Sequence, residues 1–243
     1  MSGLSLSSVS YTYGAKTALD DVGFAVEPNA FCALLGPNGA GKSTLFGLLT
    51  RLLSGTKGQI EIAGHDLRAA PRKALGKLGV VFQQTTLDLD LTVRQNLSYF
   101  AALHGISGVD ASRKIDDVLA RMDISDRAGE KVRTLNGGHR RRTEIARALL
   151  HQPRVLLLDE PTVGLDAAAR RAITDHVHDL TDDGICVLWA THLTDEVRDA
   201  DRLVILHRAK VLADGRAADI RGDMALSDRF LIMTAPGKSE AAR

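Results

Sequence analysis

A glycine-rich segment at residues 36–44 has the residue types and spacing of a phosphate-binding loop, Gly-x-x-x-x-Gly-Lys-Ser. It follows an apolar run at 31–35 and precedes a helical pattern of leucines, which is the strand, loop and helix context that the motif requires. Its glycines allow successive N–H groups to point at phosphate oxygens, and the helix adds the positive end of its dipole. Lys42 could then reach the β- and γ-phosphates of a nucleotide, while the Ser43 hydroxyl could ligate Mg²⁺. A turn that only connects a strand to a helix is less favoured, because every fixed position is filled.

Two acids end a second apolar run, in the sequence Val-Leu-Leu-Leu-Asp-Glu-Pro at 155–161. This pattern places both carboxylates at the carboxyl edge of a parallel sheet, where such folds bind their ligands. Asp159 could hold Mg²⁺ through a water molecule, and Glu160 could polarise an attacking water as a general base. A strand end followed by a solvated turn is the alternative, and the phosphate loop upstream argues against it.

Several short strands must position these residues. Apolar or alternating runs predict strands at 4–13, 22–26, 31–35, 59–62, 78–82, 155–158, 185–189, 204–206 and 210–213. A helix predicted over about 167–180 separates two of them, which indicates parallel strands joined by a crossover helix. The last two strands are expected to form a hairpin.

The stretch from 91 to 152 has a different character, because β-branched runs are scarce there. Thr92 is predicted to cap a helix that ends at Leu103, and Ser112 to cap another that ends at Met122. A third helix is expected from about 138 to 150. We interpret this stretch as a helical insertion.

Composition excludes several classes of protein. Lys and Arg number 31 against 30 Asp and Glu, so the net charge of +1 provides no basic field for nucleic acid or anionic lipid. The first residues lack the pattern of an export signal, and no run approaches the roughly 18 apolar residues of a membrane helix. Cys32 and Cys186 lie in apolar runs and are expected to be buried, unpaired thiols in a reducing compartment. We therefore expect a cytoplasmic chain whose membrane role, if any, comes through partners.

Six motifs in order, together with the aromatic residue Tyr13, resemble those of the ATP-binding cassette (ABC) family, and the resemblance extends from about residue 4 to residue 215. Besides the phosphate loop and the acid pair, the matching positions are Leu135-Asn136-Gly137-Gly138-His139 as the signature, Gln83 as the Mg²⁺-sensing glutamine, Gly164-Leu165-Asp166 as the D-loop, His192 as the switch histidine and Tyr13 as the aromatic that stacks on adenine.

The resemblance implies an α/β fold, a P-loop NTPase cassette with a RecA-like core and a mostly parallel sheet. An N-terminal antiparallel β-subdomain and an inserted α-helical subdomain would complete it. The cassette would span 1–221, with its core at 1–83 and 153–221 and the insertion at 84–152. A tail would follow at 222–243, and its last residues, 236–243, are expected to be frayed.

The resemblance also implies roles for individual residues. The nucleotide would contact Tyr13, Gly36, Pro37, Asn38, Gly39, Ala40, Gly41, Lys42, Ser43 and Thr44. Catalysis would use Glu160, His192 and Gln83, and Mg²⁺ would be held by Ser43, Gln83 and Asp159. Leu135, Asn136, Gly137, Gly138, His139 and Asp166 would make contacts across a dimer interface.

Partners follow from the same resemblance. A homodimer, or a pair with a related ATPase subunit, would sandwich ATP and Mg²⁺ between one chain's phosphate loop and the other's signature. Transmembrane permease subunits would dock beside Gln83 and residues 88–93, placing the chain on the inner face of the cell membrane, and no nucleic acid is expected. Asn136 replaces the usual serine and His139 the usual glutamine. We expect altered turnover and not a dead site, because Lys42, Glu160 and His192 are present.

Three motifs are similar in sequence to those of drug- and ABC-2-type exporter ATPases, namely the residues at 80–84, 161–166 and 191–197. The sequence Leu-Asn-Gly-Gly-His-Arg-Arg-Arg also resembles a subgroup associated with PQQ-dependent alcohol dehydrogenase systems.

A cassette protein of translation or DNA repair usually carries two cassettes or a long coiled coil, and neither fits in 243 residues. A module that binds ATP without hydrolysing it stays open because of Asn136. A GTP switch is disfavoured because the chain has no Asn-Lys-x-Asp motif.

Overall fold

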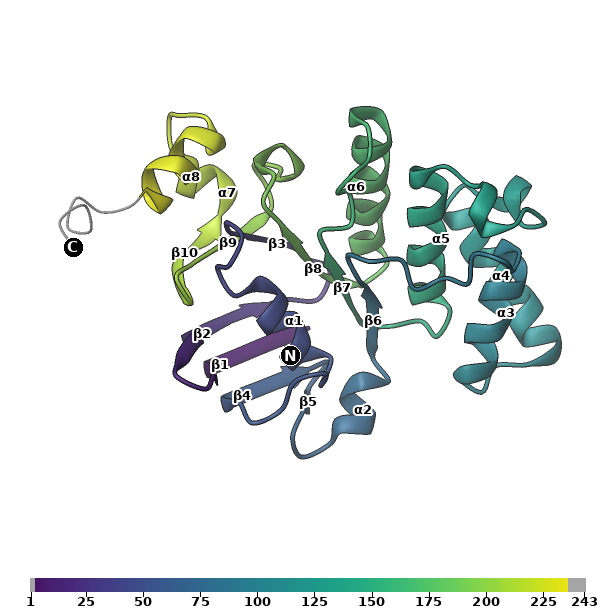
Figure 1. The fold of residues 1–243 in the computed structure, drawn as a ribbon, viewed down its shortest axis with the longest axis horizontal. Coiled ribbons are helices and arrows are strands. Elements are labelled where there is room, and N and C mark those ends of the chain that lie inside the picture. Colours follow the sequence, from purple (N-terminus) through teal and green to yellow (C-terminus); the bar gives the residue numbers. More distant parts are fainter. Residues whose placement is uncertain (1–2, 236–243) are drawn as a thin grey trace.

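Two β-sheets and eight α-helices form residues 3–235, the part of the chain that the computed structural model describes (Figure 1). The strands are β1 (Leu4–Tyr13), β2 (Lys16–Val26), β3 (Phe31–Leu35), β4 (Lys57–Ile62), β5 (His65–Asp66), β6 (Leu78–Val81), β7 (Val155–Asp159), β8 (Cys186–Thr191), β9 (Arg202–His207) and β10 (Lys210–Arg216). The helices are α1 (Lys42–Leu49), α2 (Pro71–Leu75), α3 (Val93–Leu103), α4 (Gly108–Arg121), α5 (Gly137–Leu149), α6 (Ala167–Asp182), α7 (Ala217–Arg221) and α8 (Leu226–Thr234). All nine predicted strands are present, some of them longer than predicted.

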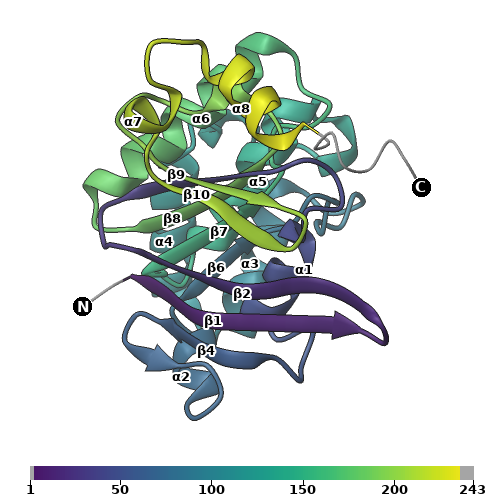
Figure 2. The ribbon, with the colours of Figure 1, turned by 90° about the vertical axis from the view of Figure 1, so that its left-hand side faces the viewer.

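The N-terminal strands form an antiparallel sheet in the order β2-β1-β4-β5. Strand β1 is central to it, with Leu4 opposite Val26 on one side and Ile62 on the other. Figure 2 shows this sheet crossing the front of the molecule, beneath the second sheet. The antiparallel β-unit expected at the N-terminus is therefore confirmed.

The second sheet has six strands in the order β10-β9-β3-β8-β7-β6. Its five strands from β9 to β6 run parallel to one another, and only β10 is antiparallel, forming the predicted hairpin with β9. Helix α6 connects the parallel neighbours β7 and β8, as the crossover prediction required. The carboxyl ends of β3, β7 and β8 meet at one edge, where Leu35 and Asp159 lie beside Thr191 and Ala190.

Both faces of this sheet are buried, which explains why its central strands are continuous apolar runs. On β3, Phe31, Ala33 and Leu35 face the core beneath helices α3–α6. Cys32 and Leu34 face a second core, which the sheet shares with α1 and the antiparallel sheet. Cys32 and Cys186 are buried and unpaired within the described chain, as predicted. These two cores hold the carboxyl edge of the sheet in place.

The helical insertion contains α3, α4 and α5, which Figure 1 shows grouped beyond β6. Thr92 caps α3 as predicted: its Oγ1 accepts the Gln95 N–H at 3.1 Å, and the Gln95 side chain accepts the Thr92 N–H at 2.9 Å. The predicted cap at Ser112 is wrong, because α4 begins at Gly108 after the N-cap Ser107.

Helix α4 begins one turn early because Asp110 stabilises that turn. The Asp110 carboxylate lies 2.8 Å from Arg113 and 3.7 Å from Lys114, and it also complements the helix dipole.

The region expected to be a tail contains α8, whose Phe230 and Met233 pack against the helix-side core. The predicted frayed end, 236–243, lies outside the described residues. Within 3–235, no helix combines the length and the apolar character that a bilayer crossing requires.

Candidate nucleotide-binding site

The phosphate-loop sequence curls between β3 and α1. Gly41, the N-cap of α1, has a φ of 117° and makes no side-chain capping bond. A Cβ at this position would lie 2.6 Å from the Ala18 carbonyl oxygen, so only glycine fits there. The N–H groups of the first turn of α1 are consequently left for an anionic ligand, at the positive end of the helix dipole.

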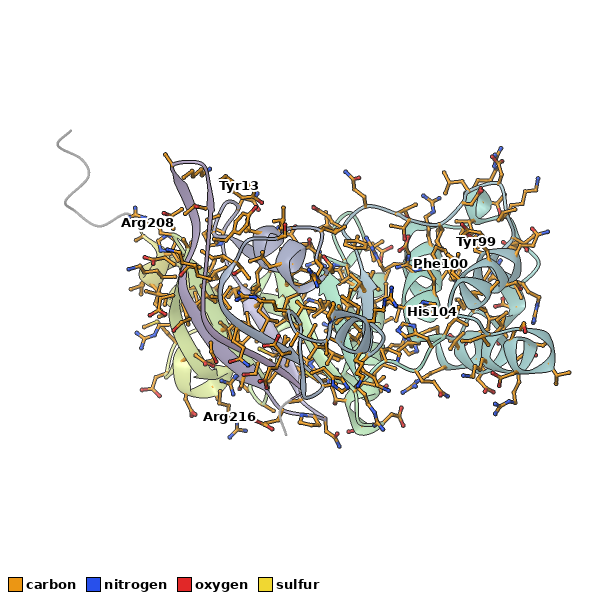
Figure 3. All side chains as sticks on the ribbon, turned by 90° about the horizontal axis from the view of Figure 1, so that it is seen from below. Tyr13, Tyr99, Phe100, His104, Arg208 and Arg216 are labelled. Atoms are coloured by element: carbon orange, nitrogen blue, oxygen red, sulfur yellow. The ribbon has the colours of Figure 1, made fainter. Side chains whose placement is uncertain are left out.

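A cleft of about 660 Å³ opens above this loop, within the range of small-molecule sites. Its lining includes Tyr13, Lys16, Pro37, Asn38, Gly39, Gly41, Lys42, Ser43, Thr44, Gln83, Glu160 and Arg208. Tyr13 is 48% exposed and meets Tyr11 edge-on at 5.0 Å, an arrangement that leaves ring surface for stacking on a base. Figure 3 shows Tyr13 and Arg208 at the same end of the molecule.

Lys16 and Arg208 were missed by the sequence reasoning. Lys16 follows the turn between β1 and β2, and Arg208 lies in the turn between β9 and β10. A basic residue at such a place carries no motif that distinguishes it from a solvated surface charge. The turn after β9 reaches the cleft because the Ala209 N–H donates to the Ala40 carbonyl at 3.2 Å. Both cations add positive charge to a cleft suited to phosphates.

Glu160 is the centre of a cluster built from four separate segments. Its carboxylate is only 11% exposed and lies 3.3 Å from Lys42 Nζ and 3.3 Å from His192 Nδ1. Gln83 Nε2 donates to its other oxygen at 3.4 Å. Lys42 Nζ also donates to the Gly36 carbonyl at 2.6 Å, which holds the ammonium over the phosphate loop. These four side chains therefore lie together at the carboxyl edge of the sheet, above the phosphate loop.

Asp159 ends β7 beside this cluster and is nearly buried. The pKa of its carboxyl is raised to about 6, chiefly by burial and to a lesser degree by the charge of Glu160, while Lys42 acts in the opposite direction. A cation beside Asp159 would offset the cost of its buried charge. Within 3–235 no group of three or more His, Cys, Asp or Glu could hold a metal, so Mg²⁺ would depend on few protein ligands. Ser43, Gln83 and Asp159 offer the hard oxygen donors that Mg²⁺ prefers, with water and phosphate oxygens completing the shell.

The signature residues lie elsewhere on the chain. Asn136 is the N-cap of α5, where its Oδ1 accepts the His139 N–H at 2.8 Å. A Cβ on Gly137 would lie 2.8 Å from Leu165 Cδ2, so the start of α5 packs directly on the segment before α6. Asp166 caps α6 by accepting the Ala169 N–H at 2.8 Å. Residues 135–139 and Asp166 thus form one group at two adjacent helix N-termini, and that group is not among the residues lining the chain's own cleft.

Comparison with known proteins identifies relatives of this chain in sequence and in structure. A model of the family described as "ABC transporter" matches residues 19–163. The linearmycin resistance ATP-binding protein LnrL of Bacillus subtilis (strain 168) is 32% identical over 239 residues, which cover 98% of this chain and 76% of that protein. The daunorubicin resistance ATP-binding protein DrrA3 of Streptomyces coeruleorubidus is 38% identical over 212 residues, 87% of this chain and 67% of the relative. Among solved structures, cbiO1 from Clostridium perfringens, described as part of the ABC transporter complex cbiONQ, superposes with a TM-score of 0.85 at 26% identity and covers 95% of each chain.

Proposed function

Because the chain belongs to the ABC transporter family, as an ATP-binding subunit and ATPase, we propose that it hydrolyses ATP at the interface of a dimer and so drives transport through separate transmembrane subunits. The observation that carries this proposal is the cluster of Lys42, Gln83 and His192 around the Glu160 carboxylate. A strand end with a structural acid would not require three further polar side chains at the same carboxylate.

The cluster has a direct chemical use. Lys42, held over the loop, binds the β- and γ-phosphates, and the γ-phosphate competes with Glu160 for its ammonium. Glu160 then accepts a proton from the attacking water, while Gln83 and His192 keep its oxygens in line. Tyr13 stacks on the base. Mg²⁺, when bound through Ser43, Gln83 and Asp159, neutralises charge that develops on the phosphates.

The position of the signature outside the cleft of its own chain supports a role for a second chain. We propose that residues 135–139 of one copy, or of a related ATPase subunit, close the cleft of the other, with Asp166 beside the interface. The N-terminus of α5 would then present the N–H groups of Gly137 and Gly138, and the Asn136 amide, to the γ-phosphate. Two such contacts arranged about a two-fold axis give a closed dimer.

The membrane subunit is proposed to dock on the helical insertion beside Gln83. The Asp88 N–H donates to Asn96 Oδ1 at 2.8 Å, and Asn96 Nδ2 donates to the Asp88 carbonyl at 2.9 Å, so the segment 88–92 is held against α3. The placement of α3–α5 beyond β6 supports the division into a core at 1–83 and 153–221 and an insertion at 84–152. Such docking would place the chain on the inner face of the membrane.

Export is the proposed direction of transport, because the two relatives described above are named for resistance to linearmycin and to daunorubicin. The more specific resemblance to a subgroup of PQQ-dependent alcohol dehydrogenase systems stays a prediction.

The decisive test of hydrolysis is Glu160→Gln. This variant should lose ATPase activity by about 10²-fold or more, since a general base contributes roughly 10²–10⁴-fold. It should nevertheless form a dimer with ATP, detected by size-exclusion chromatography with multi-angle scattering. Wild-type turnover in the variant would show that Glu160 is not the base. A wild-type chain that dimerises with ATP but does not hydrolyse it would instead support the binding-module alternative.

Transport is tested by purification of the tagged chain from membranes. A polytopic membrane protein should copurify with it. Recovery only with ribosomes or DNA would contradict the transport role.

A further inference from the structure

Three side chains of α5, those of Arg141, Glu144 and Arg147, bond the signature helix to the segment that carries Gln83. We name residues 82–86 the glutamine segment; it follows β6 directly. Arg141 and Glu144 lie on the first two turns of α5, and each makes more than one hydrogen bond to this segment. Neither contact follows from the nucleotide chemistry described above, since neither side chain lines the cleft.

Glu144 has a fully buried side chain, with 0% exposure. Its Oε1 accepts hydrogen bonds from Thr85 Oγ1 at 3.0 Å and from the Thr86 N–H at 2.8 Å, and its Oε2 accepts one from Thr86 Oγ1 at 3.2 Å. Arg147 Nη2 lies 3.8 Å from Oε2 and compensates its charge, and Arg147 Nη1 donates to Thr86 Oγ1 at 2.6 Å. A buried carboxylate is costly unless such donors surround it, so this geometry resists displacement.

Arg141 hydrogen-bonds to the other end of the glutamine segment. Its Nη1 donates to the Phe82 carbonyl at 2.7 Å and its Nη2 donates to the Gln83 carbonyl at 2.9 Å. The rigid fork of a guanidinium fixes two successive carbonyls together, which a single flexible donor does not. The peptide that carries the Gln83 side chain is therefore oriented by α5.

The hydrogen bonds of Arg141 and Glu144 join two regions that lie at different sites, the glutamine segment and the start of α5. Gln83 lines the chain's own cleft and donates to Glu160. Gly137, about one helical turn before Arg141, belongs to the signature group that does not line that cleft. In the dimer proposed above, one end would therefore meet the chain's own nucleotide and the other the partner's.

We propose that Arg141 and Glu144 are positioning residues that make Gln83 and residues 135–138 move as one unit, so that the nucleotide in one site of the dimer sets the geometry of the other site. This inference rests on the proposed dimeric function. A coupling of this kind makes binding at the two sites cooperative, because occupancy of the first site pre-positions the groups that contact the second nucleotide.

Arg142 provides a matched control, since it lies on the same helix next to Arg141. Its guanidinium bonds to the Met122 carbonyl at 3.4 Å and to Asp123 Oδ2 at 3.1 Å, both within the helical insertion. An Arg142→Ala change therefore removes an equally large cation without touching the glutamine segment.

The experiment measures the ATP dependence of hydrolysis for the wild type, Arg141→Ala, Glu144→Ala, Glu144→Gln and Arg142→Ala. The wild type and Arg142→Ala should be sigmoidal, with a Hill coefficient between about 1 and the limit of about 2 for two sites. Arg141→Ala and Glu144→Ala should become hyperbolic, with a lower kcat. The affinity of each variant for ADP, measured by calorimetry, should stay within about twofold of wild type, because the phosphate loop is unaltered.

Glu144→Gln separates positioning from folding. Its amide oxygen can keep both bonds of Oε1, and its amide nitrogen can replace Oε2 beside Thr86 Oγ1, so sigmoidal kinetics should return. If Glu144→Ala does not fold, Arg141→Ala and Glu144→Gln decide the matter. Sigmoidal kinetics with wild-type kcat in Arg141→Ala would overturn the inference, and so would a wild type that dimerises with ATP but shows hyperbolic kinetics. A wild type that forms no dimer with ATP would instead remove the proposed dimeric function itself.

Discussion

Asn136 offers a perturbation that separates the fold of the signature helix from its proposed contact with a nucleotide. Its Oδ1 is engaged as the N-cap of α5, accepting the His139 N–H at 2.8 Å. The amide nitrogen has a different orientation from the oxygen and is a donor only. An Asn136→Asp substitution preserves the size and the capping oxygen, but it replaces this donor with a second acceptor and adds a negative charge.

The stability of Asn136→Asp should therefore equal or slightly exceed that of the wild type. A carboxylate at a helix N-terminus contributes about 0.3–1 kcal/mol through the dipole. For a chain of 243 residues this corresponds to a rise in Tm of no more than roughly 4 °C. Asn136→Ala, which loses the cap, should instead be destabilised by about 1 kcal/mol.

The function of Asn136→Asp should fall steeply despite its intact fold. A hydrogen bond to a charged group is worth about 1.5–3 kcal/mol, so loss of the amide donor alone should weaken ATP-driven dimerisation roughly 10- to 100-fold. Repulsion between the new carboxylate and the γ-phosphate adds to this loss. Asn136→Ser retains both a cap and a donor, and it should hydrolyse ATP at a similar or higher rate than wild type.

The assay combines thermal unfolding with sedimentation in the presence of ATP, for all three variants in a Glu160→Gln background that prevents turnover. Asn136→Asp with a normal Tm and a wild-type dimerisation constant would refute the reasoning, because it would place the Asn136 amide away from the nucleotide. A large loss of ATPase activity in Asn136→Ser, measured separately with Glu160 intact, would show that the site depends on asparagine itself.

Three further predictions concern the cleft and the core. Lys42→Ala should weaken ATP binding at least about 10-fold, since a charge-assisted bond is lost, and displacement of a fluorescent nucleotide would measure it; an unchanged Kd would contradict the placement of Lys42 over the phosphates. Trp189→Phe should lower the free energy of unfolding by about 1–3 kcal/mol in urea titrations, because the buried Glu196 carboxylate loses the indole N–H that now lies 3.0 Å away. Burial raises the pKa of both thiols, that of Cys186 to about 12, so Cys32 and Cys186 should resist DTNB at pH 8 in the native protein and react after unfolding; rapid labelling of native protein would disprove their burial.

Local patterns were sufficient for the elements that carry the candidate site. A buried parallel strand is a continuous apolar run, so β3 and β7 could be located closely from their residues alone. The capping box at Thr92 is likewise a local signal, complete within four residues. The start of α4 was mispredicted because Ser112 and Ser107 are both capable caps, and the ion pairs of Asp110 favour the earlier one.

Contacts between distant segments left no comparable signal. The hydrogen bond from Gln83 to Glu160 joins residues 77 positions apart, and the bond from Arg141 to Phe82 joins residues 59 apart. Arginine and glutamate on α5 have the composition of an ordinary solvated helix face, yet packing buries Glu144 completely against the glutamine segment. Burial of a charge depends on what packs over it, and a helical pattern does not specify that.

The sequence by itself determined the chemistry of this protein: a phosphate loop, an acid pair at a strand end and a helix that begins with glycines, because each of these is a short stretch whose backbone geometry depends on its own residues. Only the tertiary structure decided that Glu160 meets Lys42, Gln83 and His192, and that the signature group lies away from the cleft of its own chain. The physical reason is that the parallel sheet brings the carboxyl ends of strands from distant parts of the chain to one edge, whereas α5 starts beyond that edge, in the helical insertion.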